Sequence, residues 1–182
     1  GHADLDTNKI VPKEDMVRNR DRENTWLLGD SGGFQIGKGV WEGDWKDPNC
    51  PKAQKKREQV LAWMDAYMDY GMILDIPAWV ARSPAGAKAT GISTYQEAVD
   101  ATRINNDYFM KHRTGACKFL NVLQGENHAD AEDWYQQMKD YCDPIKYPDT
   151  HFNGWSMGGQ NMCDVHLVLK RIVTLRFDNL LQ

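Results

Sequence analysis

The stretch Leu27-Leu28-Gly29-Asp30-Ser31-Gly32-Gly33-Phe34-Gln35 decides the fold that we expect for this chain. Two apolar residues are typical of the end of a buried strand, and a carboxylate, a hydroxyl and two glycines follow at once. A sheet presents a catalytic group in this way. Gly32 and Gly33 suit a turn that lets a small planar ligand approach the main chain, and Phe34 offers a stacking face. The four residues Asp-Ser-Gly-Gly taken alone also suit an ordinary surface turn.

Strand and helix signals alternate along the rest of the chain. Short apolar runs predict strands over residues 72–74 and 118–123, and an extended piece is expected at residues 151–152. Apolar residues at helical spacing predict helices over residues 52–70, 94–114, 129–141 and 162–175. Glycine and proline predict loops over residues 36–51 and 81–93. Alternation of this kind is typical of parallel strands with helices packed outside.

Two of the predicted helices carry specific expectations. The helix over residues 94–114 starts at a capping-box pattern, formed by Ser93 with Gln96 or by Thr94 with Glu97. Its expected buried stripe consists of Ala98, Ala101, Ile104 and Tyr108. The expected inward face of the last helix consists of Val165, Val168, Leu169 and Ile172.

Polar groups follow each predicted strand. Asp30, Asp75 and Gln124 come directly after apolar runs, and a glycine-rich run follows Phe152. In a (β/α)₈ TIM barrel the active site lies on this carboxyl face of the strands. We therefore expect an α/β fold, a TIM barrel of which the chain holds the first half to two-thirds, over residues 26–182. Residues 1–25 are expected to be irregular, and a flavodoxin-like open sheet is the alternative fold.

Composition and charge limit the class of protein. A chain of 182 residues with 41% hydrophobic and 26% charged residues has ordinary globular composition. No apolar run approaches the roughly 20 residues that cross a membrane, and the N-terminus lacks a signal-peptide pattern, so we expect a cytoplasmic protein. The formal charge of -4 gives no general attraction to phosphate. Two basic clusters, residues 52–57 and 111–113, suit either a phosphate contact or the solvated face of a helix.

The cysteines give no metal-binding pattern. They are widely spaced, without a Cys-x-x-Cys pair, at Cys50, Cys117, Cys142 and Cys163. We expect reduced thiols, no metal site and no cofactor within this chain.

The run Asp30-Ser31-Gly32-Gly33-Phe34-Gln35 resembles the signature of the tRNA-guanine transglycosylase family, whose members exchange a guanine in nucleic acid for a 7-deazaguanine base. Asp75 stands where such enzymes have an aspartate that binds the Watson–Crick edge of guanine. Leu123-Gln124-Gly125 resembles the Gln-Gly of the family, whose glutamine binds the same base. Asn153-Gly154-Trp155-Ser156-Met157-Gly158 resembles the family's Gly-Gly-Leu-Ala-Val-Gly loop, whose backbone closes the base pocket.

The resemblance implies a role for each of these positions. Asp30 would be the general acid and base of a double displacement that passes through a covalent sugar–enzyme intermediate. The residues expected to bind substrate are Ser31, Gly32, Phe34, Asp75, Gln124, Gly125, Gly154 and Trp155. The nucleophilic aspartate and the zinc-binding cysteines of the family would lie downstream of Gln182, so the chain looks truncated. The implied partners are tRNA or DNA, guanine and a 7-deazaguanine base, with no membrane.

Several departures from the family pattern leave alternatives open. Ile76-Pro77 replaces the Glu-Cys of common members, and Gly159 stands where a glutamate contributes to the choice of base. These changes suit a divergent branch such as the phage-type relatives that modify DNA. A non-catalytic guanine- or RNA-binding paralogue that acts as a partner subunit is the second hypothesis. Under either hypothesis the chain could form a homo- or heterodimer. An unrelated barrel hydrolase that uses Asp30 and Asp75 as its carboxylate pair is the third.

Overall fold

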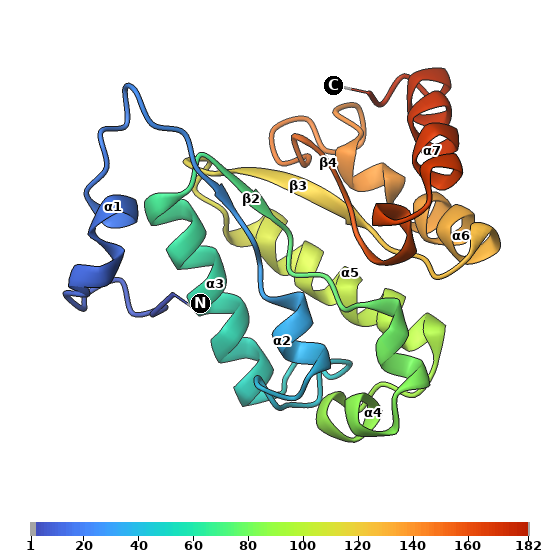
Figure 1. The fold of residues 1–182 in the computed structure, drawn as a ribbon, viewed down its shortest axis with the longest axis horizontal. Helices are drawn as coiled ribbons and strands as arrows, with labels where there is room; N and C mark the ends of the chain where they lie inside the picture. Colours follow the sequence, from blue (N-terminus) through green and yellow to red (C-terminus); the bar gives the residue numbers. More distant parts are fainter. Residues whose placement is uncertain (1–2, 182) are drawn as a thin grey trace.

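A computed structural model describes residues 3–181 and contains one parallel β-sheet (Figure 1). Its strands are β1 (Leu28–Gly29), β2 (Tyr70–Met72), β3 (Lys118–Leu123) and β4 (Gly154–Met157). The strand order is β1-β2-β3-β4, so each strand pairs with its neighbour in sequence. Because all pairs are parallel, the carboxyl ends of the four strands lie along one edge of the sheet. The expected α/β class with parallel strands is confirmed.

The four longer helices connect or follow these strands close to the predicted positions. They are α3 (Pro51–Tyr67), α5 (Tyr95–His112), α6 (His128–Met138) and α7 (Val165–Phe177). A 3₁₀ turn, η3 (Lys139–Cys142), extends α6, and a second turn, η4 (Gly159–Met162), precedes α7. Strand β3 has the bounds expected from its apolar run, and β2 lies two residues before its expected position.

Much of the loop expected over residues 81–93 is helical, because two short helical segments lie in or overlap it. These are η2 (Ala78–Arg82) and α4 (Pro84–Thr90). The loop prediction is wrong here because the stretch is rich in alanine, which has the highest helix propensity, as well as in glycine and proline. The boundary signals are present: the Ser83 side chain accepts from the Gly86 N–H, and Gly91 ends α4 with a φ of 75°.

The motif after β1 also forms a helix. Residues that we expected to turn around a ligand make the short helix α2 (Gly33–Gly37), and a loop then leads to α3. Gly32 precedes α2 with a φ of 90°, a left-handed conformation that glycine adopts readily.

The N-terminal segment is more structured than the irregular stretch we expected. It contains η1 (Pro12–Glu14) and α1 (Asp15–Arg18). The Arg18 guanidinium pairs with Glu14 at 2.9 Å and donates to the carbonyl oxygens of Asp4 and Lys9. Arg20 pairs with Asp69 at 2.8 Å, which ties the segment to the residue before β2.

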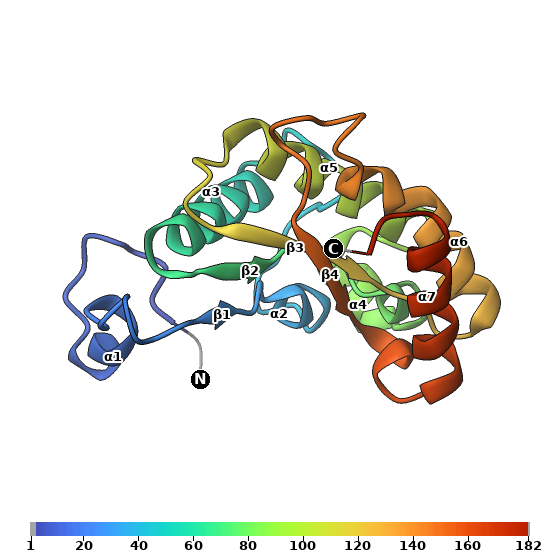
Figure 2. The same cartoon turned by 90° about the horizontal axis from the view of Figure 1, so that it is seen from above.

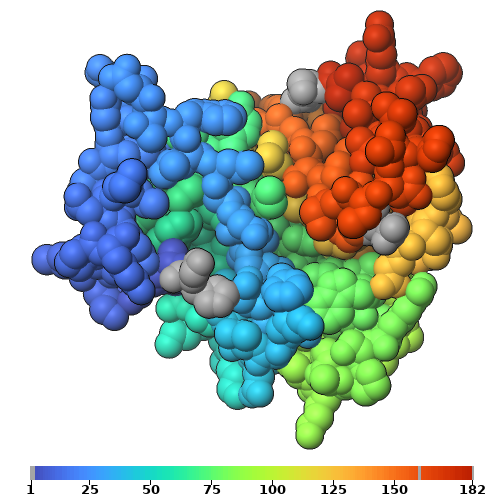
Figure 3. Space-filling view, in the orientation of Figure 1, coloured from blue at the N-terminus to red at the C-terminus, as the bar shows by residue number. Residues whose placement is uncertain are grey.

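Helices α3 and α5 lie on one side of the sheet (Figure 2). A Cβ atom on Gly29 or on Gly71 would lie 2.6 or 2.8 Å from the sulfur of Met64, so these two glycines face α3. Since side chains alternate along a strand, Leu28 points to the other face, where it is 52% exposed. That face is hollowed in the space-filling view, between β1 and the C-terminal part of the chain (Figure 3). The sheet is therefore covered on one face and open on the other.

The buried face of α7 differs from the predicted one. Leu167, Arg171 and Leu175 are buried, whereas Val165 and Leu169 are 69% and 55% exposed. The helix is apolar on most sides, so the sequence pattern did not identify the inward face. Arg171 turns inward because its guanidinium lies 4.2 Å from the Tyr135 ring and pairs with Glu132 at 2.6 Å.

The capping box at the start of α5 forms with Thr94 and Glu97, one of the two pairs that the sequence offered. We expect Thr94→Ala to lower the free energy of unfolding by about 1 kcal/mol, because the Glu97 N–H loses its acceptor. Urea denaturation measures this change. The matched control is Thr174→Ala in the last turns of α7, where the hydroxyl bonds only the Lys170 carbonyl. Equal losses in both variants would contradict the capping role.

Candidate functional site

The carboxyl ends of β1, β2 and β3 bring together three polar side chains that the sequence singled out. Asp30 follows β1 directly, Asp75 lies three residues after β2, and Gln124 follows β3 directly. The Gln124 amide donates from Nε2 to Asp75 Oδ2 at 2.6 Å, and the charge of Asp30 acts on Asp75. Both carboxylates therefore lie at the same edge of the sheet.

The two carboxylates have different environments. Asp75 is only 6% exposed, and its burial raises its pKa to about 6, with a smaller contribution from the charge of Asp30. The hydrogen bond from Gln124 acts in the opposite direction and lowers this pKa. Asp30 is exposed. The site thus combines a buried carboxyl group that titrates near neutral pH with a solvent-accessible one.

Two side chains of α5 hold the backbone on either side of Asp75. The Asn105 amide donates from Nδ2 to the Leu74 carbonyl oxygen at 2.7 Å, and Thr102 Oγ1 accepts from the Ile76 N–H at 3.0 Å. Neither residue was expected at the site, because the predicted buried stripe of α5 contains only apolar residues and tyrosine. Of the predicted stripe, Ala98 and Ala101 are buried but Ile104 and Tyr108 are only partly buried. Thr102 and Asn105 lie one turn after Ala98 and Ala101 on the buried face, and this spacing was the available signal.

The main chain approaches the Asp75–Gln124 pair at two glycines. A Cβ atom on Gly33, at the start of α2, would overlap the carbonyl oxygen of Asp75. A Cβ atom on Gly158, just after β4, would lie 2.5 Å from Nε2 of Gln124. Any other residue at these positions would displace the pair, so the loops after β1 and β4 pack directly on it.

Gly154 and Trp155 do not reach the site, contrary to expectation. Both lie within β4, where Gly154 pairs with Leu120. Gly154 is four residues before Gly158, a separation of roughly 13 Å along the strand. The Trp155 indole donates to the Leu180 carbonyl oxygen at 2.8 Å, which makes it a packing residue. The predicted strand ended at Phe152, and the paired strand begins two residues later. Gly158 and Gly159 therefore occupy the position that we expected for Gly154.

The other predicted residues shape the loops around the pair. Ser31 is 3% exposed, and its hydroxyl has no hydrogen-bond partner among residues 3–181. Gly32 lies under the Trp41 ring, and a Cβ atom on this glycine would lie 2.5 Å from the ring. Gly125 packs on the backbone of Ala131 in α6. Phe34, in contrast, is 57% exposed and lies beside the site.

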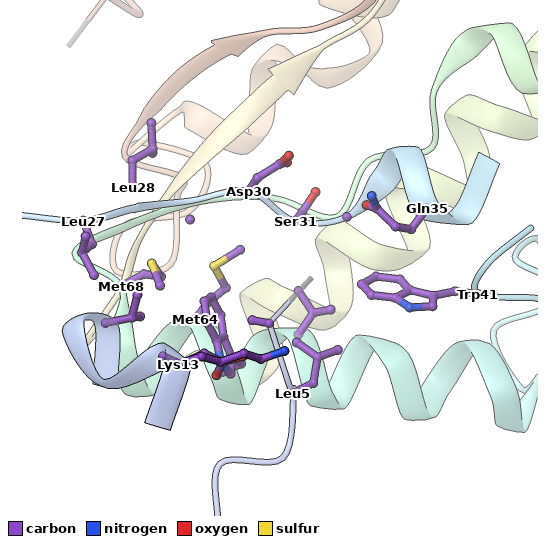
Figure 4. A pocket seen from close by; sticks show the side chains of 17 residues that line it. Leu5, Lys13, Leu27, Leu28, Asp30, Ser31, Gln35, Trp41, Met64 and Met68 are labelled. Atoms are coloured by element: carbon purple, nitrogen blue, oxygen red, sulfur yellow. The ribbon is translucent and has the colours of Figure 1, made fainter. Parts of the chain in front are cut away.

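The cavity next to β1 is separate from this polar pair. It has a volume of about 650 Å³ and lies between β1, α3 and the N-terminal segment. Asp30 and Ser31 belong to its rim, but their side chains point to the side of β1 opposite Met64 and Leu5 (Figure 4). The lining of the cavity is mixed, with Lys13, Glu14 and Gln35 beside apolar side chains. We assign the candidate chemistry to the Asp30, Asp75 and Gln124 cluster, where a buried carboxylate is paired with an amide.

The structure and its comparisons add three findings. Among residues 3–181, no three His, Cys, Asp or Glu side chains are placed to hold a metal ion, and the four cysteine thiols are free. None of the described helices has the length and apolar character needed to cross a membrane. Comparison with protein-family models, curated proteins and solved structures finds no match. The fold and site thus define an α/β protein with a carboxylate–amide cluster at the carboxyl edge of a parallel sheet.

Proposed function

We propose that this chain forms the base-binding part of a transglycosylase that exchanges guanine in tRNA or DNA for a 7-deazaguanine base. The buried Asp75 carboxylate, hydrogen-bonded to Gln124 beside the exposed Asp30, is the observation that supports this proposal most strongly. Guanine carries donors at N1 and N2, which an ionised carboxylate accepts, and an acceptor at O6, which an amide N–H satisfies. The resemblance of four sequence segments to the transglycosylase family supports the same assignment.

The complete fold that we propose for this sheet and its helices is a (β/α)₈ barrel. The four parallel strands in sequential order would be consecutive barrel strands, and the open face of the sheet would be the barrel interior. Asp30, Asp75 and Gln124 would then lie at the carboxyl rim, where barrel enzymes hold their active sites. The helices on the covered face would form the outer ring.

The proposed chemistry assigns different tasks to the two aspartates. The target nucleotide leaves its stack, and Asp75 with Gln124 binds the edge of its base. The bond between the sugar and guanine breaks as a nucleophilic carboxylate bonds to the sugar carbon, and Asp30 donates a proton to the departing base. Asp30 then removes a proton from the incoming 7-deazaguanine as it displaces the carboxylate. The resemblance assigns the nucleophile to a later strand, so base binding is the step to test with this chain.

We expect the chain to bind guanine about tenfold more weakly at pH 5 than at pH 7.5, because an Asp75 with a pKa of about 6 is mostly protonated at the lower pH. A protonated carboxyl group accepts fewer hydrogen bonds from N1 and N2. Isothermal titration calorimetry at the two pH values measures the difference. Adenine, which lacks both donors, is the control ligand and should bind far more weakly. Guanine binding that is independent of pH, or equal to adenine binding, would refute the proposal.

A further inference from the structure

Two aromatic side chains lie next to the candidate site without belonging to the Asp75–Gln124 cluster. Phe34 lies four residues after Asp30 in α2, and Trp79 lies four residues after Asp75 in η2, so both come from the helical segments that follow the carboxylates. Their ring centroids are 6.1 Å apart, and the ring planes are inclined at 60°. The Trp79 ring packs against Gly37 in α2, while Phe34 is more than half exposed. Aromatic surface is thus available to a ligand beside the site.

Lys38 adds a positive charge to these rings. Its ammonium nitrogen lies 5.4 Å from the centroid of Phe34 and 5.4 Å from that of Trp79. Within the described range 3–181, no carboxylate lies within 4.0 Å of it, whereas Lys46 pairs with Glu97 at 3.6 Å. Lys38 is exposed and held in place by the two rings. It can therefore bind an anion without first breaking an ion pair.

We propose that Trp79 and Lys38 form a second subsite, which binds the nucleotide next to the one whose base enters the Asp75 site. The neighbouring base would stack on the aromatic surface of Trp79 and Phe34, and the phosphate between the two nucleotides would contact Lys38. Proteins that bind single strands combine aromatic platforms with cations in this way. The inference rests on the proposed nucleic-acid substrate, and the ligand is a short single-stranded stretch of RNA or DNA.

The basic clusters noted in the sequence are less suited to this role. Arg57 is completely buried and donates to Asn105 at 2.6 Å. Arg113 donates to the carbonyl oxygens of Thr150 and His151. Both guanidinium groups are therefore used inside the fold. Lys111, in the last turn of α5, is exposed and serves as a control lysine, because α5 ends near the amino ends of the strands.

Fluorescence polarisation with labelled guanine-containing decamers tests the subsite, with single-stranded RNA and single-stranded DNA of the same sequence in separate arms. We expect Trp79→Leu to weaken binding of the preferred strand about tenfold, which is the range found for loss of one stacked base. Lys38→Gln should weaken binding and reduce its salt dependence. The negative slope of log K against log salt should become shallower by about 0.7. Lys38→Arg should keep most of the affinity, and Lys111→Gln should change neither quantity.

The outcomes separate this inference from the proposed function. Free guanine should bind equally to the wild type, Lys38→Gln and Trp79→Leu, since neither side chain belongs to the base site. Loss of decamer binding in both variants, with guanine binding retained, supports the subsite. If guanine fails to bind but the decamers still bind through Trp79 and Lys38, the proposed function falls and the subsite stands. Equal decamer binding by Lys38→Gln, Lys111→Gln and the wild type, or no binding by the wild type, overturns the inference.

Discussion

Asp75→Asn is expected to stabilise the protein at neutral pH and to abolish guanine binding. Burial raises the pKa of Asp75 from its ordinary value of 3.8 to about 6 in the folded chain. The folded state therefore binds a proton more tightly than the unfolded state. This tighter proton binding stabilises the folded state fully below about pH 4, and the stabilisation is lost as the pH rises through about 6. An asparagine carries no charge, so the variant avoids this loss.

The size of the stability effect follows from the two pKa values. A change from 3.8 to about 6 corresponds to about 3 kcal/mol in the free energy of unfolding. We expect Asp75→Asn to gain up to this amount at pH 7 and close to nothing at pH 4. The Gln124 amide can turn so that its oxygen accepts from the new Asn side chain, which keeps the contact. The Asn side chain offers one acceptor oxygen in place of two, so the N1 and N2 protons of guanine no longer both find an acceptor.

Urea denaturation at pH 4 and pH 7, together with calorimetric titration of guanine, tests both parts of this prediction. Asp100→Asn is the matched control, because Asp100 is an exposed aspartate of α5. It should leave the stability difference between the two pH values and the guanine affinity unchanged. If Asp75→Asn destabilises the chain at pH 7, the carboxylate is a structural group that the fold needs in its charged form. If it keeps guanine affinity, the assigned role in base binding is wrong.

The features that the sequence predicted correctly depend on local signals. Local sequence is enough to predict strand β3 from its apolar run and the start of α5 from its capping box. It also predicts that polar residues follow β1, β2 and β3. Parallel pairing in sequential order then brings Asp30, Asp75 and Gln124 to one edge. An alternating strand–helix pattern is sufficient to predict this arrangement, because the helix that follows each strand leads back to the amino ends of the sheet.

The features that were missed depend on partners distant in sequence. Gly154 and Trp155 lack the pattern of a strand, and β4 forms there because it pairs with β3 from Leu120 to Leu123. One consequence is that Gly158, rather than Gly154, reaches Gln124. The positioning residues of Asp75 were missed for a similar reason. Asn105 is polar, so apolar periodicity gives no sign of it, and its partners lie on other elements.

Asn105→Ala is expected to destabilise the protein by about 3–5 kcal/mol, a large part of the 5–15 kcal/mol that is typical of a folded domain. Asn105 is completely buried and connects two groups that have no access to water. Its Oδ1 accepts from Arg57 Nε at 2.6 Å, and its Nδ2 donates to the Leu74 carbonyl oxygen at 2.7 Å. The substitution leaves a buried guanidinium with weaker contacts, at 3.4 Å to Trp45 and Gln54, and an unpaired carbonyl.

The neighbouring residue provides a matched control for this prediction. Asn106 is also completely buried, but its Oδ1 has no partner among residues 3–181 and its amide faces only the sulfur of Met138 at 3.8 Å. Asn106→Ala should therefore cost clearly less in urea denaturation than Asn105→Ala. Equal losses would mean that cavity formation, and not the broken hydrogen bonds, determines the effect.

A double-variant cycle separates the Arg57 contact from the Leu74 contact. Arg57→Met removes the buried charge, so the pair Arg57→Met with Asn105→Ala should cost less than the sum of the two single substitutions, by about 1–3 kcal/mol. The loss of stability that remains comes from the unpaired carbonyl oxygen of Leu74, the residue before Asp75 in the chain. A coupling energy of zero would mean that the hydrogen bond to Asn105 does not stabilise the buried Arg57 guanidinium. The lower stability of Asn105→Ala would then come from the segment that positions the Asp75 carboxylate, and guanine affinity should fall with it.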